Sequence, residues 1–474
     1  MKLNNANVKQ TIKDATKMLE KEKNISPAFR AVIQLLLAFV QLMVDRLGLN
    51  SKNSSKPPST DQKNAKEKKK RKKSTRKPGG QKGRQGVQLK PVEDPDVVEN
   101  ISIDRRGLPK GKYVEDGYES RQVIDFEVSL IITEYRAQVL TDTLGNRFVA
   151  PFPDFVTRPV QYGPNIKSTA VYMSQFQMIP YNRIVDYFSD QAGFNISPGS
   201  LYNFNKEAYD KLEEFETIVK EKLISSSVVN ADETGINVNG KRIWLHTACN
   251  EKWTHFFPHE KRGTEAMNAI GILPKVNGVL CHDYWKAYFT YTCKHSLCCA
   301  HLIRELEWSS SEDKQKWAGS VKKFLTKLNK KVNDSGGQLP LERCSYYLKK
   351  YKKMLSDAEQ ECPKPNIKRK KGQRGQIKKS KSRNLLERLI KNEAEVLRFM
   401  YEKDVPFTNN QGENDLRMTK VQQKISGCFR SIEGAMIFCR IRSYLITCRK
   451  HGMDPTEALS FLYKGMLPDF LKPG

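Results

Sequence analysis

The chain has 474 residues and a formal net charge of +29 at pH 7. This length predicts roughly two to four domains rather than one, and so large a positive charge predicts a polyanionic partner such as nucleic acid. Most of the excess charge lies in two runs: residues 61–90 carry a net +11 and residues 364–383 a net +10, which leaves +8 for the rest. The folded part of the chain is therefore expected to be only mildly basic.

The cysteines and the apolar residues argue against two further classes of protein. All ten cysteines lie between Cys249 and Cys448 without a Cys-x-x-Cys pair, which favours free thiols in a reducing cytoplasm over a disulfide framework. The N-terminus is polar, so no signal peptide is expected. The most apolar window, residues 32–44, contains Gln34 and Gln41 and falls short of the roughly 18 residues of a membrane span.

Residues 1–49 are predicted to form an N-terminal helical region, and residues 50–91 a linker. Ser26 followed by Pro27 is typical of a helix start, and the apolar residues that follow cover more than a narrow seam. A dimer contact and packing against the rest of the chain are both consistent with such a helix. The linker is rich in Lys, Ser, Pro and Gly and cannot bury a core. We expect it to contact DNA phosphates, with a tether that has no partner as the alternative.

Residues 92–160 are predicted to form a small antiparallel β unit, and residues 161–222 a helical domain. In the β unit one strand face is predicted to carry Ile124, Phe126, Val128, Leu130 and Ile132, with a turn at residues 144–146. The helical domain should contain helices over 181–191 and 197–215, joined by a turn at 192–195 and capped by Ser197. This pair is consistent with a helix-turn-helix that binds DNA and equally with an ordinary helical hairpin.

Residues 223–308 have the strand order of the first part of an α/β domain. An apolar strand ends on Asp232, two strands follow over 241–249 and 253–258, and Asn239-Gly240 predicts a tight hairpin between the first two. A helix over 264–270 leads to a fourth strand that ends on Asp283. Three antiparallel strands, a helix and a fourth strand are the ribonuclease-H-like order, in which the first and fourth strands are neighbours. Asp232 and Asp283 are therefore expected to meet.

A third carboxylate is predicted well downstream. Residues 309–403 are predicted to be a helical insertion that carries the second basic run, either to clamp DNA or as a passive spacer, and residues 404–474 to hold the last catalytic helix and C-terminal helices. Asn409 and Asn410 are predicted to cap a helix with Glu413 in its first turn. Arg417, Lys420 and Lys424 follow Glu413 at i+4, i+7 and i+11, which places all four on one helix face. An acid at the helix start with solvated bases behind it is the alternative interpretation.

Together these motifs resemble one family. Five segments in this order carry the resemblance: Ala-Asp-Glu-Thr-Gly (231–235), His-Asp-Tyr-Trp-Lys-Ala-Tyr (282–288), Cys-Cys-Ala-His-Leu-Ile-Arg-Glu (298–305), Asn-Asn-Gln-Gly-Glu-Asn-Asp-Leu-Arg-Met (409–418) and Gln-Lys-Ile-Ser-Gly-Cys-Phe-Arg-Ser (423–431). The chain is similar to transposases of the insertion sequence 66 family, which are DDE transposases. The resemblance implies an α/β core of ribonuclease-H-like type, a mixed sheet with helices, interrupted by the helical insertion. It also implies that Asp232, Asp283 and Glu413 form the catalytic triad.

The resemblance further implies the partners of the triad. His301, Arg304 and Glu305 would face the active site, and Arg417, Lys420, Lys424, Arg430, His301 and Arg304 are the residues expected to contact DNA. Gly412 stands where the family usually has Ala, a change expected to weaken the helix start slightly without affecting the chemistry. A Cys-x-x-Cys zinc site, usual in relatives, is missing because residues 1–248 contain no Cys.

Carboxylates held together repel unless a cation lies between them, and their oxygens suit Mg²⁺ or Mn²⁺ rather than zinc. Two such ions would support cleavage at the ends of an insertion sequence and strand transfer into target DNA. The alternatives are a nuclease or resolvase without strand joining, and a DNA-binding protein with a vestigial site. Cys293, His295, Cys298 and His301 lie close in sequence. No zinc is expected nevertheless, because a structural zinc site needs four ligands in regularly spaced pairs.

The expected setting is a bacterial cytoplasm, on DNA, as a homodimer and with accessory transposition proteins possible. No membrane partner is expected.

Overall fold

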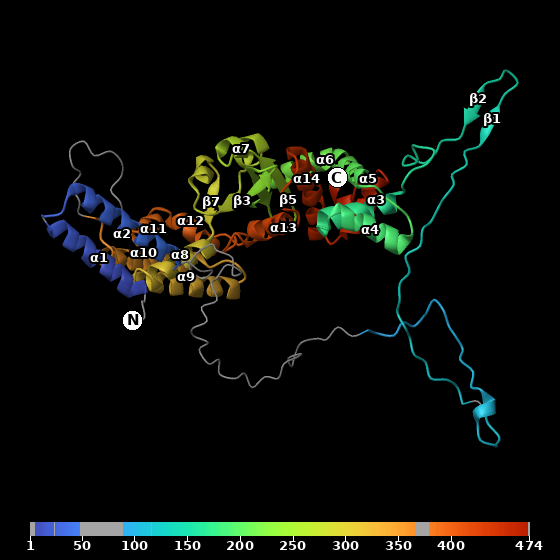
Figure 1. Ribbon diagram of the computed structural model, residues 1–474, viewed down its shortest axis with the longest axis horizontal. Helices are drawn as coiled ribbons and strands as arrows, with labels where there is room; N and C mark the ends of the chain where they lie inside the picture. The colour runs from blue at the N-terminus through green and yellow to red at the C-terminus, as the bar shows by residue number, and fades with distance from the viewer. Residues whose placement is uncertain (1–4, 23, 48–88, 115, 366–378, 473–474) are drawn as a thin grey trace. The chain divides into compact units, whose positions relative to one another are not determined.

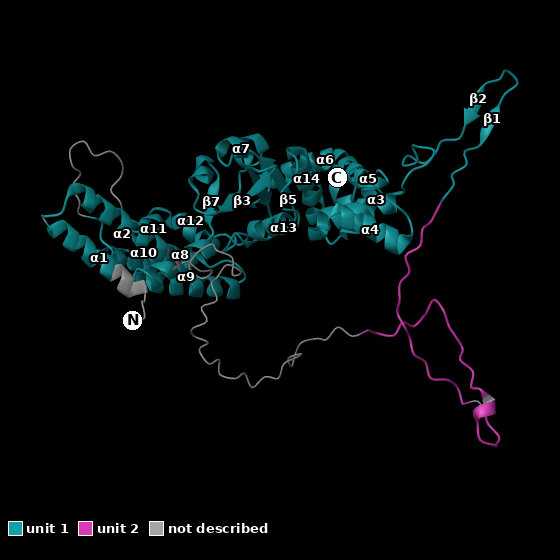
Figure 2. Cartoon of the chain, viewed as in Figure 1, with its two compact units in different colours: residues 1–62, 133–474 teal, residues 63–132 magenta. Residues whose placement is uncertain are grey.

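The computed structural model describes residues 5–22, 24–47, 89–114, 116–365 and 379–472. Two compact units are present (Figure 2): residues 1–62 with 133–474, and residues 63–132. The second unit is extended and exposed over its described part, apart from a short 3₁₀ turn at Arg105–Gly107. Within it, the side-chain amide of Gln122 pairs with both the N–H and the carbonyl of Val92, each at 2.7 Å.

The N-terminal residues form a helical hairpin of α1 (Asn5–Lys21) and α2 (Pro27–Leu47). As expected, α2 starts at Pro27, and the Ser26 hydroxyl accepts a hydrogen bond from the N–H of Phe29 at 3.2 Å. The Arg30 guanidinium donates to the Leu19 carbonyl at 2.7 Å, which satisfies one of the carbonyls that a helix leaves free at its C-terminus.

The apolar side chains of α2 are largely exposed: Phe29, Val32, Leu35, Leu36, Phe39, Val40, Leu42 and Met43. The stretch Pro27–Val44 is long and apolar enough to cross a membrane, so the expectation that no window reaches this length was wrong. Gln34 and Gln41 interrupt the stretch without making it polar. A single such helix near the N-terminus is weak evidence of a span, because core helices and signal sequences have the same length and composition.

The β unit is smaller than predicted. It consists of β1 (Val139–Thr141) and β2 (Arg147–Val149), which pair antiparallel around the expected turn, where Gly145 has a φ of 83°. The Asp142 carboxylate accepts the N–H of Asn146 at 2.8 Å and holds this turn. The alternating segment 124–132 forms no strand, because alternation yields a strand only where a neighbouring strand is available to pair with it.

A helical layer precedes the central sheet. Its helices are α3 (Pro164–Val171), which continues into a π turn (Tyr172–Phe176), α4 (Tyr181–Ala192), α5 (Pro198–Lys211) and α6 (Glu213–Ile224). The turn between α4 and α5 uses Gly193 in the left-handed region, and the Ser197 hydroxyl accepts from the N–H of Ser200 at 3.0 Å as the predicted cap. The helix predicted over 197–215 breaks at Leu212, whose side chain is fully buried. Three acids in the next turn then favour a new helix start.

The central sheet has five strands in the order β5-β4-β3-β6-β7 (Figure 1). The strands are β3 (Val228–Val238), β4 (Lys241–Cys249), β5 (Thr254–His259), β6 (Val279–His282) and β7 (Lys294–Leu297). Strands β3, β4 and β5 are antiparallel, whereas β6 and β7 run parallel to β3. Asn239 and Gly240, both at positive φ, make the predicted hairpin, and α7 (Thr264–Ile270) with short 3₁₀ turns at Leu273–Lys275 and Lys286–Thr290 connects the strands. The mixed sheet with helices confirms the predicted α/β core.

Helices follow the last strand of the sheet. They are α8 (Cys299–Ser311), α9 (Lys316–Asp334), α10 (Leu341–Glu361), α11 (Lys381–Lys391) and α12 (Glu393–Leu397) with a 3₁₀ turn at Arg398–Met400, then α13 (Asn410–Ser426), α14 (Ile432–Lys450), α15 (Pro455–Tyr463) and a 3₁₀ turn at Asp469–Leu471. Helices α8 to α12 share one apolar core with β6 and β7, whereas α14 and α15 pack with α3, α5 and the rest of the sheet. Asp454 precedes α15, and its side chain makes no capping hydrogen bond. The basic run 61–90 and most of the run 364–383 lie outside the described residues.

Candidate active site

The register of the sheet brings two of the predicted carboxylates together. The last parallel pair between β3 and β6 joins Asn230 to Cys281. Asp232 and Asp283 each follow two residues later, so they lie side by side where this pairing ends. Asp232 lies within β3 rather than at its end as predicted, because β4 continues to pair with β3 as far as Val238.

The helix α13 is tied to β3 at both of its ends. Before the helix, the side-chain amide of Asn409 donates to the carbonyl of Ala231 at 2.9 Å. After the helix, the N–H of Phe429 donates to the carbonyl of Asn237 at 2.9 Å. A Cβ atom placed on Gly412 would lie 3.5 Å from the Cβ of Asp232. The helix α13 and the strand β3 therefore approach closely at the residue before Glu413. A methyl group at this position would make an ordinary van der Waals contact with Asp232, so the expectation that Gly412 in place of Ala leaves the chemistry unaffected stays a prediction.

Asn409 was expected to cap α13, but its side chain makes no capping hydrogen bond. Its side-chain amide donates to the Ala231 carbonyl instead, and its backbone N–H donates to the Sγ atom of Cys298 at 3.1 Å. The thiol of Cys298 lies 3.9 Å from Glu413. The start of α13 is therefore fixed by β3 on one side and by the residue before α8 on the other.

Asp283 and Glu413 lie close enough to Asp232 for their charges to perturb its carboxyl group. Burial, followed by the negative charge of Glu233, raises the pKa of Asp232 to about 8, and the charges of Asp283 and Glu413 add to the rise. The N–H of Glu233, which donates to Asp232 at 2.9 Å, offsets only part of it. A cation between these oxygens would remove the repulsion, and an all-carboxylate set suits a hard divalent ion such as Mg²⁺ or Mn²⁺. The type of donor atom therefore fits the metal expected for this site.

A second acid beside Asp232 belongs to a network that sequence reasoning missed. The Glu233 carboxylate is almost fully buried and accepts from the Arg262 guanidinium at 2.6 and 2.9 Å and from the Tyr288 hydroxyl. Burial raises the pKa of Glu233, while the hydrogen bonds from Tyr288 and Arg262 oppose the rise. The only sequence signal was the acid directly after Asp232, because its partners lie 29 and 55 positions away.

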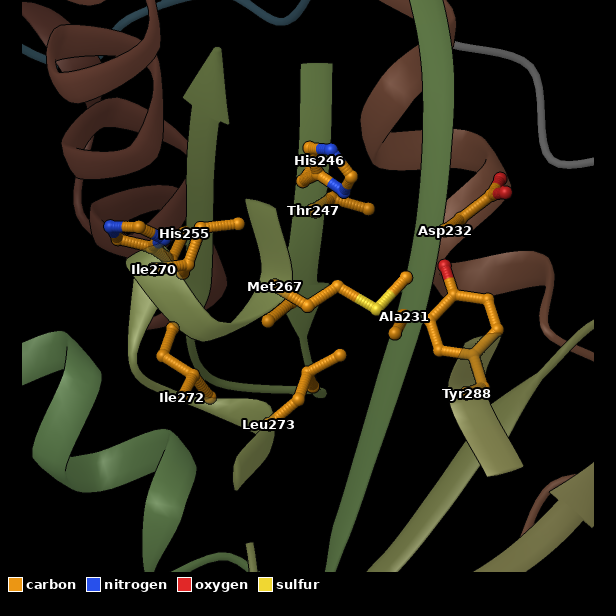
Figure 3. A pocket seen from close by; sticks show the side chains of 11 residues that line it. Ala231, Asp232, His246, Thr247, His255, Met267, Ile270, Ile272, Leu273 and Tyr288 are labelled. Atoms are coloured by element: carbon orange, nitrogen blue, oxygen red, sulfur yellow. The ribbon is translucent and has the colours of Figure 1, made fainter. Parts of the chain in front are cut away.

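Figure 3 shows Asp232 and Tyr288 together at one side of a small cavity that Thr247, Met267 and Leu273 also line. Its volume is about 10 Å³, which is room for about one water molecule. The Thr247 hydroxyl is buried without a hydrogen-bond partner among the described residues. This cavity is too small to receive a substrate.

The profile of the transposase IS66 family matches residues 159–437, more than half of the chain. The chain belongs to this transposase family. A second profile, a family of unknown function (DUF6444), matches residues 5–90. No curated protein matches the chain.

In this transposase, His301 and Arg304 both approach the predicted catalytic glutamate. The Nδ1 atom of His301 lies 3.7 Å from Glu413, and a guanidinium nitrogen of Arg304 lies 3.8 Å from its other oxygen. Glu305, on the same helix, forms an ion pair with Arg388 of α11. Two residues predicted to contact DNA thus lie beside Glu413, where they are placed to orient its carboxylate.

The other predicted DNA contacts of the transposase differ in their surroundings. Arg417, Lys424 and Arg430 are exposed. Lys420 donates from its ammonium to the carbonyl of Gly235 in β3, and burial together with the charge of Arg242 lowers its pKa. Lys420 is therefore partly used to hold α13 against β3.

One group of potential zinc ligands is present among the described residues: Cys298, His301 and Glu413 have ligand atoms within 4.8 Å of one another. His295 is not part of it, because its two ring nitrogens contact His282 and the Tyr291 carbonyl, each at 3.0 Å. Burial raises the pKa of the Cys298 thiol, whereas metal binding needs the thiolate. The absence of zinc therefore stays a prediction.

Proposed function

We propose that this chain is a DDE transposase that cleaves DNA at the ends of an insertion sequence and joins those ends to target DNA. The supporting observation is the convergence of Asp232, Asp283 and Glu413, from three separate elements, in a chain of the transposase IS66 family. The strand order, with three antiparallel strands followed by two parallel ones, supports a ribonuclease-H-like core.

In this proposal Asp232, Asp283 and Glu413 hold two Mg²⁺ or Mn²⁺ ions. When bound, such ions make a water or a DNA 3′-hydroxyl more acidic and stabilise the leaving 3′-oxygen. The hydroxyl oxygen attacks phosphorus and the bond from phosphorus to the 3′-oxygen breaks, so no side chain becomes attached to DNA. The backbone N–H of Trp285, which donates to Asp283 at 2.8 Å, and the His301–Arg304 pair hold two of the three carboxylates in position.

Basic residues around this site would bind the DNA backbone. Arg417, Lys424 and Arg430 are exposed on α13 and just after it, where they would neutralise phosphates near the scissile bond. We further propose that the runs at 61–90 and 364–383 contact DNA without sequence preference, that α4 and α5 act as a helix-turn-helix, and that residues 1–49 mediate a homodimer. For the division of the chain into domains we keep the predicted boundaries after residue 49, which are 50–91, 92–160, 161–222, 223–308, 309–403 and 404–474.

The deciding experiment supplies a duplex that ends in the terminal repeat of the chain's own insertion sequence, either uncut or already cut to leave a 3′-hydroxyl. Joining of the pre-cut end to a target plasmid in Mg²⁺ is the expected result. Cleavage without joining would favour a nuclease or resolvase. Binding with neither reaction would favour a vestigial site.

A further inference from the structure

A cavity of about 240 Å³ opens beside Asp283. Residues from several parts of the fold line this Asp283 cavity: Arg262 between β5 and α7, Tyr284 and Trp285 just after β6, Glu305 of α8 and Arg388 of α11. It is smaller than the roughly 300–1,000 Å³ of sites for whole drug-sized ligands. Its position next to a catalytic carboxylate means that a DNA strand bound there would pass its mouth.

The walls of the Asp283 cavity are flat side chains held in place. The Arg262 guanidinium lies over the Trp285 ring at 4.3 Å and over Trp244 at 4.7 Å, and Glu233 fixes its far side. The Arg388 guanidinium lies over the Tyr284 ring at 4.7 Å. Aromatic rings and arginine planes are the surfaces on which proteins stack unpaired bases. Ion pairs and stacking contacts hold these planes without a ligand, which lowers the entropy cost of binding.

The charges of the Asp283 cavity are balanced. Arg262 pairs with Glu233, and Arg388 pairs with Glu305, so neither guanidinium is a free cation. Asp283 adds a negative charge at the mouth. Such a lining disfavours a phosphate and favours a neutral planar group with hydrogen-bonding edges.

We propose that the Asp283 cavity receives one unstacked nucleobase from the DNA next to the scissile phosphate. The base would stack on the layered planes of Arg262 over Trp285 and of Arg388 over Tyr284. Extruding the base turns the sugar–phosphate backbone and exposes the neighbouring phosphate to the carboxylates. The inference rests on the proposed function, since it places the scissile phosphate at Asp232, Asp283 and Glu413.

The test combines DNA that lacks single bases with protein variants that lack single aromatic side chains, as in a double-mutant cycle. The affinity of the full chain for a duplex carrying its own element end joined to flanking DNA is measured with Ca²⁺ in place of Mg²⁺. Each nucleotide around the cleaved phosphate is replaced in turn by an abasic one. The protein variants are Trp285→Ala and Tyr284→Ala, and Tyr346→Ala, an exposed aromatic residue of α10, is the matched control.

On intact DNA, Trp285→Ala and Tyr284→Ala are each expected to weaken binding by roughly 5- to 150-fold, the range for one lost base–aromatic stack. At one abasic position this loss should vanish, and Tyr346→Ala should bind as the wild type at every position. The inference is overturned if both variants lose the same factor on intact and abasic DNA at all positions, which is also the result of a folding defect or of a phosphate contact. Cleavage by the wild type in Mg²⁺ is measured separately, so a failure of the proposed function is distinguished from a failure of the cavity.

Discussion

Replacing Asp232 by Asn should stabilise the metal-free protein, and the gain should grow with pH. The pKa of Asp232 is raised to about 8, from an ordinary value of 3.8, by burial and by the neighbouring carboxylates. Because the pKa is higher in the folded state, the stability linked to this group is fully present below pH 3.8 and is lost as the pH rises through about 8. Asn keeps the shape of the side chain without the charge.

The size of the effect follows from the shift. A shift of about 4 pH units at about 1.4 kcal/mol per unit gives a maximum of roughly 6 kcal/mol above pH 8, and the gain should rise by about 1.4 kcal/mol per pH unit between pH 4 and 8. Relaxation of the site and entry of water reduce this maximum, so a gain of a few kcal/mol at pH 8 is expected.

The assay is urea unfolding of the wild type and of Asp232→Asn in EDTA, from about pH 4 to pH 9. The two proteins should be nearly equal at pH 4 and diverge as the pH rises. Adding Mg²⁺ at pH 8 should stabilise the wild type more than the variant, because the ion removes the repulsion only where the carboxylate is present. A difference in stability that does not change with pH would refute the assigned origin of the raised pKa.

Three further predictions concern Glu233, the basic run 61–90 and the metal. Glu233→Gln should lower the free energy of unfolding by about 1–3 kcal/mol, measured by urea unfolding, because the Arg262 guanidinium loses its buried counter-charge; a variant as stable as the wild type would show that this pair contributes nothing. Deleting residues 61–90 should weaken binding to all DNA sequences alike and flatten its salt dependence, because phosphate contacts release counterions, whereas an unchanged slope would mean that the run is only a tether. Elemental analysis of the purified chain should find no zinc, and activity lost in EDTA should return with Mg²⁺ alone; one zinc per chain would assign a metal to Cys298, His301 and Glu413 instead.

The strand order and the convergence of the two aspartates could be predicted because the signals are local. The hairpin at Asn239-Gly240 needs positive φ at two adjacent residues, which Asn and Gly tolerate. A strand, a helix and a parallel strand then leave little freedom in topology. Glu413 could be recognised in the same way, from its position in the first turn of a helix and from the motif around it.

What sequence reasoning missed depends on distant partners. Asn409 was expected to cap its own helix, but Ala231, 178 residues earlier, takes its amide. The alternating residues 124–132 suit a strand, but no strand in the described part of the chain pairs with them. The Asp283 cavity brings together side chains of α8, of α11 and of the segment just after β6. These parts are far apart in the chain, and no spacing in the sequence indicates that they meet.

The most direct test of the central claim is strand transfer by three single variants: Asp232→Ala, Asp283→Ala and Glu413→Ala. Each is incubated in Mg²⁺ with a pre-cut element end and target plasmid, next to the wild type and to Glu265→Ala, an exposed acid of α7, as control. The account predicts that all three variants bind the DNA end but join none of it, while the control joins as the wild type does. Normal joining by any one of the three variants would contradict the assignment of that carboxylate to the active site.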